Sequence, residues 1–215
     1  MTLVLTGLEI SVYTRIVRMA LAEKYLRYSF VEADPFAEAP DPALLRMNPF
    51  RRVPVLSHDG FAIFETNAIL RYLDAAFPEP VLVPHTPRAA ARMAQVMGIV
   101  DCYGYWPLVR QVFSHRVLAP LSGDKPVEDQ IGQGLQAAIP VLGALERIAE
   151  EGIQLNGHDI SLADMFLAPM IDYFQMAPEG RDMLEVHGCL CDWWHQVRRR
   201  RSFEATRPAF AGPLT

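Results

Sequence analysis

Two hydroxyl residues open the first amphipathic segment of the chain. Ser11 precedes a segment whose apolar residues recur at the spacing of one helix face: Ile16, Val17, Ala20 and Leu21. We therefore expect Ser11 to be the N-cap of a helix, with its Oγ accepting a hydrogen bond from a backbone N–H of the first turn. The same hydroxyl can hold an anion at the positive end of that helix. Tyr13 brings a second hydroxyl into the same turn, so either residue can be the donor.

The segment NPFRRVPVL, residues 48–56, places a proline where a strand should begin. Pro54 removes one backbone donor from that strand. A cis Val53–Pro54 bond would turn the chain sharply and leave the backbone N–H and C=O of Val53 facing solvent, where they can pair with a peptide-like ligand. An ordinary trans proline at a strand start is the alternative, and these residues alone favour it.

Glu65 and Thr66 lie where a predicted strand ends and a predicted helix begins. A helix N-terminus offers unpaired N–H groups to an anion, so a ligand carboxylate can lie on the amide and hydroxyl of Thr66. The Glu65 carboxylate can bind an ammonium group. Simple helix capping is the alternative explanation for both residues.

The composition is that of an ordinary globular protein. Of 215 residues, 51% are apolar and 21% charged, which allows a sizeable core. The net charge of −5 argues against general binding to nucleic acid. No apolar run is long enough to span a bilayer, and the N-terminal MTLVLTG is too short and lacks the basic lead of a signal peptide. We expect neither nucleic acid nor a membrane as a partner.

The cysteines and histidines show no pattern typical of a metal site or a disulfide framework. The three cysteines, Cys102, Cys189 and Cys191, include no CxxC pair, and the six histidines lack the HExxH spacing. We therefore predict a reducing, cytoplasmic setting and no bound metal.

The first eighty residues alternate between strand and helix patterns. Apolar runs and alternation predict strands at residues 3–5, 28–32, 53–56 and 61–64. Helical spacing predicts helices at residues 13–24, 43–47 and 65–76. His58-Asp59-Gly60 is typical of the turn of a hairpin. The resulting βαβαββα order predicts a mixed sheet with helices packed against it.

A proline-rich stretch separates this region from an all-helical second half. Prolines 78, 80, 84 and 87 cannot sustain a helix or a central strand. Beyond them, helical patterns cover residues 88–105, 107–118, 128–151, 161–174 and 190–200. Ser161 and Asp164 have the spacing of a capping box at the start of one of these helices. The sequence therefore predicts a domain at 1–77, a semi-rigid linker at 78–87 and a helical domain at 88–215.

These motifs together resemble the glutathione S-transferase family over nearly the whole chain. Five motifs occur in the family's order and spacing: the first-helix segment ending in Arg18-Met-Ala-Leu21, NPFxxVPVL, FETNAILRYL, Ser161-Leu-Ala-Asp164, and Trp193-Trp194 followed by Arg201-Ser-Phe203. Tyr105-Trp-Pro107 and Ala119-Pro-Leu-Ser-Gly123 look most like the serine-type, phi-like and bacterial branches.

The resemblance implies an α/β thioredoxin-like N-terminal domain, an all-α C-terminal domain and a homodimer. It implies the tripeptide glutathione as co-substrate and a small hydrophobic electrophile as the second substrate. By position, Val53 with cis-Pro54 would hold the cysteinyl backbone of glutathione. Glu65 and Thr66 would hold its γ-glutamyl end, and Arg52 would reach a glutathione carboxylate or a nearby backbone group.

The resemblance also implies a catalytic role for Ser11, because in the serine-type transferases this serine donates a hydrogen bond to the glutathione sulfur. An N-cap position aims the side chain at the open end of the helix, so we choose Ser11 over Tyr13. The sequence departs from the family pattern at Val12, where proline is common. The loop at residues 38–42 also lacks the His/Lys pair that phi-type enzymes use against the glycyl carboxylate.

An aromatic segment in the second half is the candidate acceptor pocket. Tyr105 and Trp106, with Tyr103 behind them, lie in the helix that faces the first domain in this family. The resemblance implies that their rings form the apolar wall against which the electrophile binds. The alternative is that these rings belong to the core, as aromatic clusters on helices more often do.

Two other functions compete with the transferase. A binding or scaffolding module that keeps the fold without turnover would be consistent with the missing glycyl anchors. A thioredoxin-type thiol–disulfide oxidoreductase would need a cysteine at the first helix, and no cysteine precedes Cys102.

Overall fold

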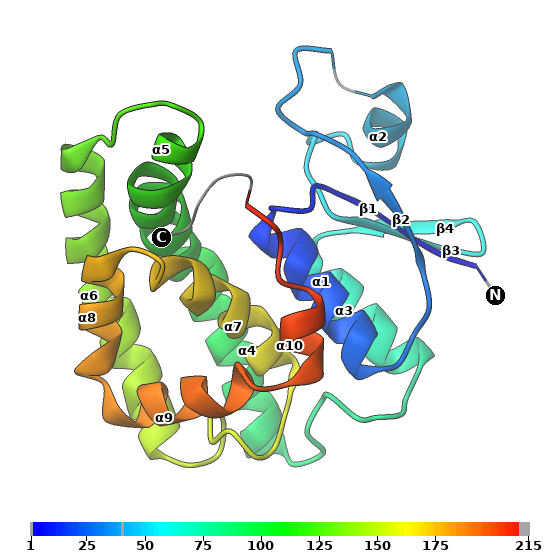
Figure 1. The fold of residues 1–215 in the computed structure, drawn as a ribbon. Helices are drawn as coiled ribbons and strands as arrows, with labels where there is room; N and C mark the ends of the chain where they lie inside the picture. The colour runs from blue at the N-terminus through cyan, green and yellow to red at the C-terminus, as the bar shows by residue number, and fades with distance from the viewer. Residues whose placement is uncertain (1, 40, 211–215) are drawn as a thin grey trace. The chain divides into compact units, whose positions relative to one another are not determined.

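The structure, a computed structural model, describes residues 2–39 and 41–210. The chain forms two compact units (Figure 1). Unit 1 consists of the described residues up to Val81 together with Glu204–Ala209. Unit 2 consists of Leu82–Phe203 together with Phe210.

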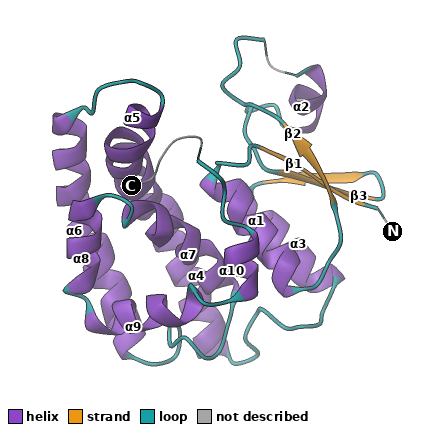
Figure 2. Ribbon diagram, viewed as in Figure 1, coloured by secondary structure: helices purple, strands orange, loops and turns teal. Residues whose placement is uncertain are grey.

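Unit 1 is built on a mixed sheet (Figure 2), whose four strands have the order β2-β1-β3-β4. Strands β1 (Leu3–Gly7) and β2 (Ser29–Glu32) are parallel, while β3 (Val55–His58) is antiparallel to both β1 and β4 (Phe61–Phe64). This confirms the predicted mixed sheet. Strand β3 begins two residues later than predicted, at Val55, because Pro54 has no N–H for the ladder.

The hairpin between β3 and β4 also confirms its prediction. His58 pairs with Phe61, so Asp59 and Gly60 alone form the turn, with φ angles of 47° and 92°. Positive φ at both central residues is the geometry of a two-residue hairpin turn whose twist matches the flanking strands.

Helices α1 (Val12–Glu23) and α3 (Thr66–Ala76) lie side by side on one face of the sheet (Figure 1). Their apolar stripes and the central strands form a core whose fully buried side chains include Leu5, Leu56, Ile16, Val17, Leu21, Ile69 and Leu73. Helix α2 (Pro42–Met47) lies on the other face (Figure 2). Its Leu44 belongs to a smaller core with Ala33 and Val55.

A buried lysine ties the ends of both long helices of unit 1 to the chain that leaves α3. The Nζ of Lys24 donates hydrogen bonds to the carbonyl oxygens of Phe77 (2.7 Å) and Pro80 (2.8 Å), and lies 2.7 Å from Asp74 Oδ1. These three partners match the three donors of an ammonium group. Lys24 therefore holds the C-terminal end of α3, where cations are favourable.

Unit 2 is helical throughout its regular elements. Its helices are α4 (Pro87–Ile99), η1 (Val100–Gly104), η2 (Trp106–Leu118), α5 (Ala119–Leu121), α6 (Glu128–Glu150), α7 (Leu162–Phe174), α8 (Pro178–Glu185), α9 (Gly188–Val197) and α10 (Arg201–Ala205), the last ending in unit 1. Every residue of α7 is buried, so α7 is the central helix of the unit. Among the described residues, no helix is both long enough and apolar enough to cross a membrane.

The two helical segments predicted at residues 88–105 and 107–118 are continuous in the structure. Helical backbone runs from Pro87 to Leu121, and its hydrogen bonding widens to the π pattern in η1 and η2. Proline inside a helix removes one N–H donor and crowds the preceding turn. Here the change in hydrogen-bond pattern accommodates Pro107 without ending the helix.

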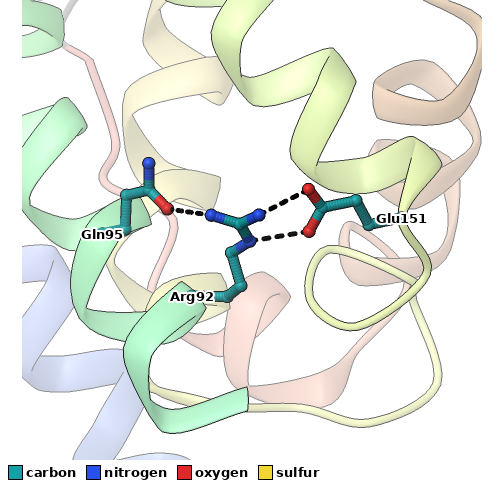
Figure 3. Close-up of polar contacts among 3 residues, drawn as sticks. All are labelled: Arg92, Gln95 and Glu151. Atoms are coloured by element: carbon teal, nitrogen blue, oxygen red, sulfur yellow. Dashed lines mark hydrogen bonds and ion pairs between the residues drawn. The ribbon is translucent and has the colours of Figure 1, made fainter. Parts of the chain in front are cut away.

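Polar contacts link the helices of unit 2 at both buried and exposed positions. Ser161 and Asp164 form the predicted capping box of α7, and Asp164 Oδ1 also accepts a hydrogen bond from Trp193 Nε1 at 2.7 Å. At the surface, Arg92 of α4 makes a bidentate pair with Glu151 at the end of α6 and donates to Gln95 (Figure 3). The buried contact joins α7 to α9, and the surface contact joins α4 to α6.

Candidate functional site

Three loops of unit 1 leave the sheet at the same end. Thr6 of β1 pairs with Val55 of β3, which pairs in turn with Phe64 of β4. The end of β1, the start of β3 and the end of β4 are therefore neighbours. The predicted glutathione-site residues adjoin these three ends: Ser11 and Tyr13 after β1, Arg52, Val53 and Pro54 before β3, and Glu65 and Thr66 after β4.

Ser11 is the N-cap of α1, as predicted. Its backbone is extended, with φ −68° and ψ 123°, and its Oγ accepts a hydrogen bond from Thr14 N at 3.4 Å. This distance is longer than the usual 2.7–3.2 Å, so the cap is weak. The hydroxyl proton is a separate donor, and no acidic side chain lies in the first turn of the helix. The half-buried Ser11 can therefore donate to an anion while it caps the helix.

Close contact between β1 and α1 fixes the position of this helix end. A Cβ at Gly7 would lie only 2.5 Å from Thr14 Cγ2, so only glycine allows the strand to end this near the helix. Thr14 is fully buried, whereas Tyr13 is half-buried in the same turn. Ser11 and Tyr13 are thus both half-buried at the start of α1, whereas Thr14 is not exposed at all.

The Val53–Pro54 peptide bond is cis. Val53 is half-buried against the small core of Leu44 and Val55, and both Val53 and Pro54 precede the first residue of β3. The main chain of Val53 is therefore outside the β-ladder. Arg52 is exposed, and its carbonyl oxygen accepts a hydrogen bond from Asn48 Nδ2 at 2.9 Å.

Glu65 is the N-cap of α3 and has a left-handed backbone, with φ 69°. Non-glycine residues rarely adopt this conformation, and such residues concentrate at ligand-binding sites. Within the described residues the Glu65 side chain makes no capping hydrogen bond and is exposed. Thr66, the first residue of α3, is 6% exposed. The capping explanation for Glu65 is therefore wrong, and its carboxylate is available to a ligand.

The predicted acceptor residues belong to unit 2, around the junction of η1 and η2. Tyr103 is 68% exposed and Trp106 is 60% exposed, while Tyr105 is half-buried. Tyr103 and Trp106 are therefore surface residues, and the interpretation of these two rings as core is wrong. Exposed aromatic rings present apolar area to which a hydrophobic molecule can bind.

Comparison with a family model and comparison with known relatives agree on one family. Residues 5–81 match the family model "Glutathione S-transferase, N-terminal domain". Glutathione S-transferase 1 of Dianthus caryophyllus is 31% identical over 175 residues, which cover 79% of this chain and 75% of that protein. The chain belongs to the glutathione S-transferase family.

Similarity to other members of the glutathione S-transferase family extends over almost the full chain. Glutathione S-transferase F13 of Arabidopsis thaliana is 26% identical over 218 residues, 97% of this chain and 96% of the relative. The solved structure of glutathione S-transferase III in its apo form superimposes with a TM-score of 0.85 at 25% identity, covering 99% of both chains. The fold is thus the thioredoxin-like domain followed by a helical domain, and the protein is an enzyme of this family.

The structure adds features around the candidate site that sequence reasoning missed. Gly7 permits the close approach of α1, Asn48 organises the loop before Val53, and Arg51 has a left-handed backbone with φ 52°. The Asn-Pro dipeptide at residue 48 was an available signal, because asparagine before proline often begins a turn. Among the described residues, no group of three or more His, Cys, Asp or Glu side chains is arranged to hold a metal ion.

Proposed function

We propose that the protein binds glutathione at unit 1 and activates its thiol for attack on a small hydrophobic electrophile. The observation that carries this proposal is the convergence of three loops at one end of the sheet. Together they offer a helix N-terminus with a hydroxyl, a stretch of main chain outside the ladder, and a second helix N-terminus with a carboxylate. This set matches a peptide that carries a thiol, an amide backbone, and an α-amino acid end.

In this proposal each loop holds one part of the tripeptide. The main-chain N–H and C=O of Val53, before cis-Pro54, pair with the cysteinyl residue as in the addition of a short strand. Thr66 holds the γ-glutamyl carboxylate at the N-terminus of α3, and Glu65 binds its ammonium group. The exposed Arg52 reaches a glutathione carboxylate.

Ser11 donates its hydroxyl hydrogen to the glutathione sulfur in this proposal. A free thiol has a pKa of about 8.5, and helix N-termini lower the pKa of a thiol because they favour the thiolate. Each unit of lowering needs about 1.4 kcal/mol of preferential stabilisation of the thiolate. One hydrogen bond to a charged acceptor contributes about 1.5–3 kcal/mol, which corresponds to one or two units. A thiolate beside a bound electrophile then reacts as a positioned nucleophile.

The second substrate follows from the exposed rings of unit 2. We assign Tyr103, Tyr105 and Trp106 to contact with the apolar part of the electrophile. The exposed faces of Tyr103 and Trp106 support this assignment. A homodimer in the cytoplasm completes the proposal, on the strength of the family alone.

The test compares two single variants in conjugation of glutathione with an aromatic halide. Ser11→Ala should lose most of the conjugation rate and shift the thiol pKa of bound glutathione upward, while still binding glutathione. Tyr13→Phe should retain most of the activity. Ultraviolet titration of the bound thiolate and steady-state rates measure the two effects.

Two outcomes would contradict the proposal in different ways. Full activity of Ser11→Ala with loss of activity in Tyr13→Phe would make Tyr13 the donor. If calorimetry of the wild-type protein detects no glutathione binding at millimolar ligand, the non-catalytic scaffold replaces the enzyme.

A further inference from the structure

Asn48 is a buried polar residue that none of the roles above requires. It is 1% exposed and ends α2, where its backbone N–H donates to Leu44 O at 2.8 Å. Its side-chain Oδ1 accepts a hydrogen bond from Phe50 N at 3.0 Å, and its Nδ2 donates to Arg52 O at 2.9 Å. Its carbonyl oxygen accepts a fourth hydrogen bond, from Arg51 N at 3.2 Å. One buried side chain thus closes the loop from residue 48 to residue 52.

These bonds hold a backbone conformation that the chain would otherwise avoid. Arg51 has φ 52°, which is costly for a residue with a side chain. The Arg51 side chain is fixed as well, because its Nη2 donates to Ala37 O at 3.1 Å. The loop before β3 is therefore a defined structure built around Asn48.

The Arg52 carbonyl determines the direction of the next amide. The Arg52–Val53 peptide is trans and planar, so its C=O and its N–H point in opposite directions. The C=O points toward the Nδ2 of buried Asn48, and the N–H of Val53 therefore points away from Asn48. Asn48 thus sets the orientation of the amide that, in the proposed function, pairs with glutathione.

The Val53 side chain is held independently of this hydrogen bond. It packs against the small core of Ala33, Leu44 and Val55. Loss of the Asn48 amide would leave this packing in place and release only the rotation of the Arg52–Val53 peptide plane. The expected consequence is a less ordered main-chain donor rather than a displaced loop.

We infer that Asn48 is a positioning residue for glutathione, acting through the Arg52–Val53 peptide; this inference depends on the proposed function. A positioning residue of this kind affects binding of the tripeptide and leaves the Ser11 hydroxyl untouched. Its removal should therefore raise KM for glutathione and leave both kcat and the pH profile of kcat nearly unchanged.

The experiment compares Asn48→Ala with a matched control in unit 2. Asn156 also organises a loop, because its Oδ1 accepts from His158 N and Asp159 N and its Nδ2 donates to Gly152 O. Asn48→Ala should raise KM and the calorimetric Kd for glutathione about tenfold, which equals about 1.4 kcal/mol. Saturating kcat should change less than about threefold. Asn156→Ala should lower Tm without changing KM.

Asn48→Asp gives a reversible version of the same test. The introduced carboxyl has no donor toward Arg52 O when ionised, and regains one when protonated. The ratio of its KM to that of the wild type should therefore fall as the pH is lowered from about 8 to about 6, since burial raises the pKa of a carboxyl. A ratio that rises as the pH is lowered contradicts the inference.

The remaining outcomes separate this inference from the proposed function. If the wild type binds glutathione and Asn48→Ala leaves KM unchanged, or lowers kcat as much as kcat/KM, Asn48 has no positioning role. If the wild type binds no glutathione, the proposed function itself fails.

If neither Asn48→Ala nor Asn48→Asp folds, hydrogen exchange of the backbone amides in the wild-type protein tests the inference instead. The Phe50 amide should be protected in the free protein. The Val53 amide should exchange faster and slow at least about tenfold with glutathione. Protection of the Val53 amide before glutathione is added would overturn the inference.

Discussion

Ser11 illustrates how one side chain can have two hydrogen-bonding roles that do not compete. Its oxygen accepts from Thr14 N, and its proton remains available as a donor. The capping hydrogen bond is long, at 3.4 Å, and therefore weak, so it holds the Ser11 side chain only loosely in position. A bound thiolate could therefore draw the hydroxyl toward itself at little cost to the helix.

Some residue roles are predictable from sequence because their partners are local. The capping box of Ser161 and Asp164 depends on an i to i+3 spacing that can be read directly, and so does the N-cap at Ser11. Asn48 and Glu65 are different. The role of Asn48 depends on burial of its whole loop, and the left-handed backbone of Glu65 depends on how β4 meets α3. Neither condition can be predicted from the spacing of residue types along the sequence.

The buried Asp164 carboxyl leads to a prediction about how the stability of the folded protein depends on pH. Burial raises the pKa of its carboxyl above the ordinary value of 3.8, although Trp193 and Ser161 donate hydrogen bonds to it. The folded state therefore holds the proton more tightly than the unfolded state. The stabilisation from this carboxyl is fully present below pH 3.8 and is lost as the pH rises through the folded-state pKa.

Asp164→Asn removes that dependence. Ser161 N donates to Asp164 Oδ2 and Trp193 Nε1 donates to Oδ1, so in the variant one of these two donors faces the NH2 group of asparagine, which cannot accept. We expect the variant to be less stable by about 1–3 kcal/mol. The stability difference from the wild type should shrink as the pH rises above 3.8 and through the raised pKa of Asp164. Urea unfolding followed by tryptophan fluorescence at several pH values measures it. A difference that grows with pH would mean that the pKa is lowered in the folded protein.

At the scale of elements, sequence periodicity predicted the long helices and missed the irregular ones. Helix α8 was not predicted because only Gly180 and Leu184 of its residues are buried, which leaves almost no apolar stripe. The π pattern of η1 and η2 was not predictable either. It changes the hydrogen-bond register of a helix but leaves its apolar residues looking like those of an ordinary helix.

Two glycines of α6 offer a matched prediction about how helices pack. A Cβ at Gly134 would lie 2.7 Å from Gln111 Cβ and 3.0 Å from Pro107 O, because α6 approaches η2 closely there. Gly132, two residues earlier, has nothing within 4 Å. Gly134→Ala should lower the free energy of unfolding by about 1–3 kcal/mol through overpacking.

Gly132→Ala is the control and should raise the same free energy by about 0.5–1 kcal/mol, since alanine favours the helix and meets no neighbour. Urea midpoints of the two variants should therefore move in opposite directions. If both variants gained stability, α6 and η2 would be able to move apart at little cost. The close contact at Gly134 would then not limit the size of the side chain there.

At the scale of the whole molecule, the site is a consequence of sheet topology. Ser11, Val53 and Glu65 are far apart in the sequence, and their loops meet only because β3 runs antiparallel to both β1 and β4. The sequence predicted the strands and the hairpin, but the position of β1 between β2 and β3 depends on pairings between distant segments. The thioredoxin-like domain in which these strands pair was predicted from the family resemblance and not from the periodicity of the sequence.

This topology leads to a prediction about the stability of the whole chain. A ligand that needs all three loops in place binds the folded state only, so it stabilises that state by RT ln(1 + [L]/Kd). At a glutathione concentration of about 100 times Kd, the gain is about 2.7 kcal/mol. For a chain of 215 residues this corresponds to a rise in Tm of roughly 5–10 °C, measured by differential scanning fluorimetry. γ-Glutamylcysteine, which keeps the thiol and the γ-glutamyl end, should give most of this shift, whereas cysteinylglycine should give little. An equal shift from cysteinylglycine would mean that Glu65 and Thr66 do not hold the γ-glutamyl group.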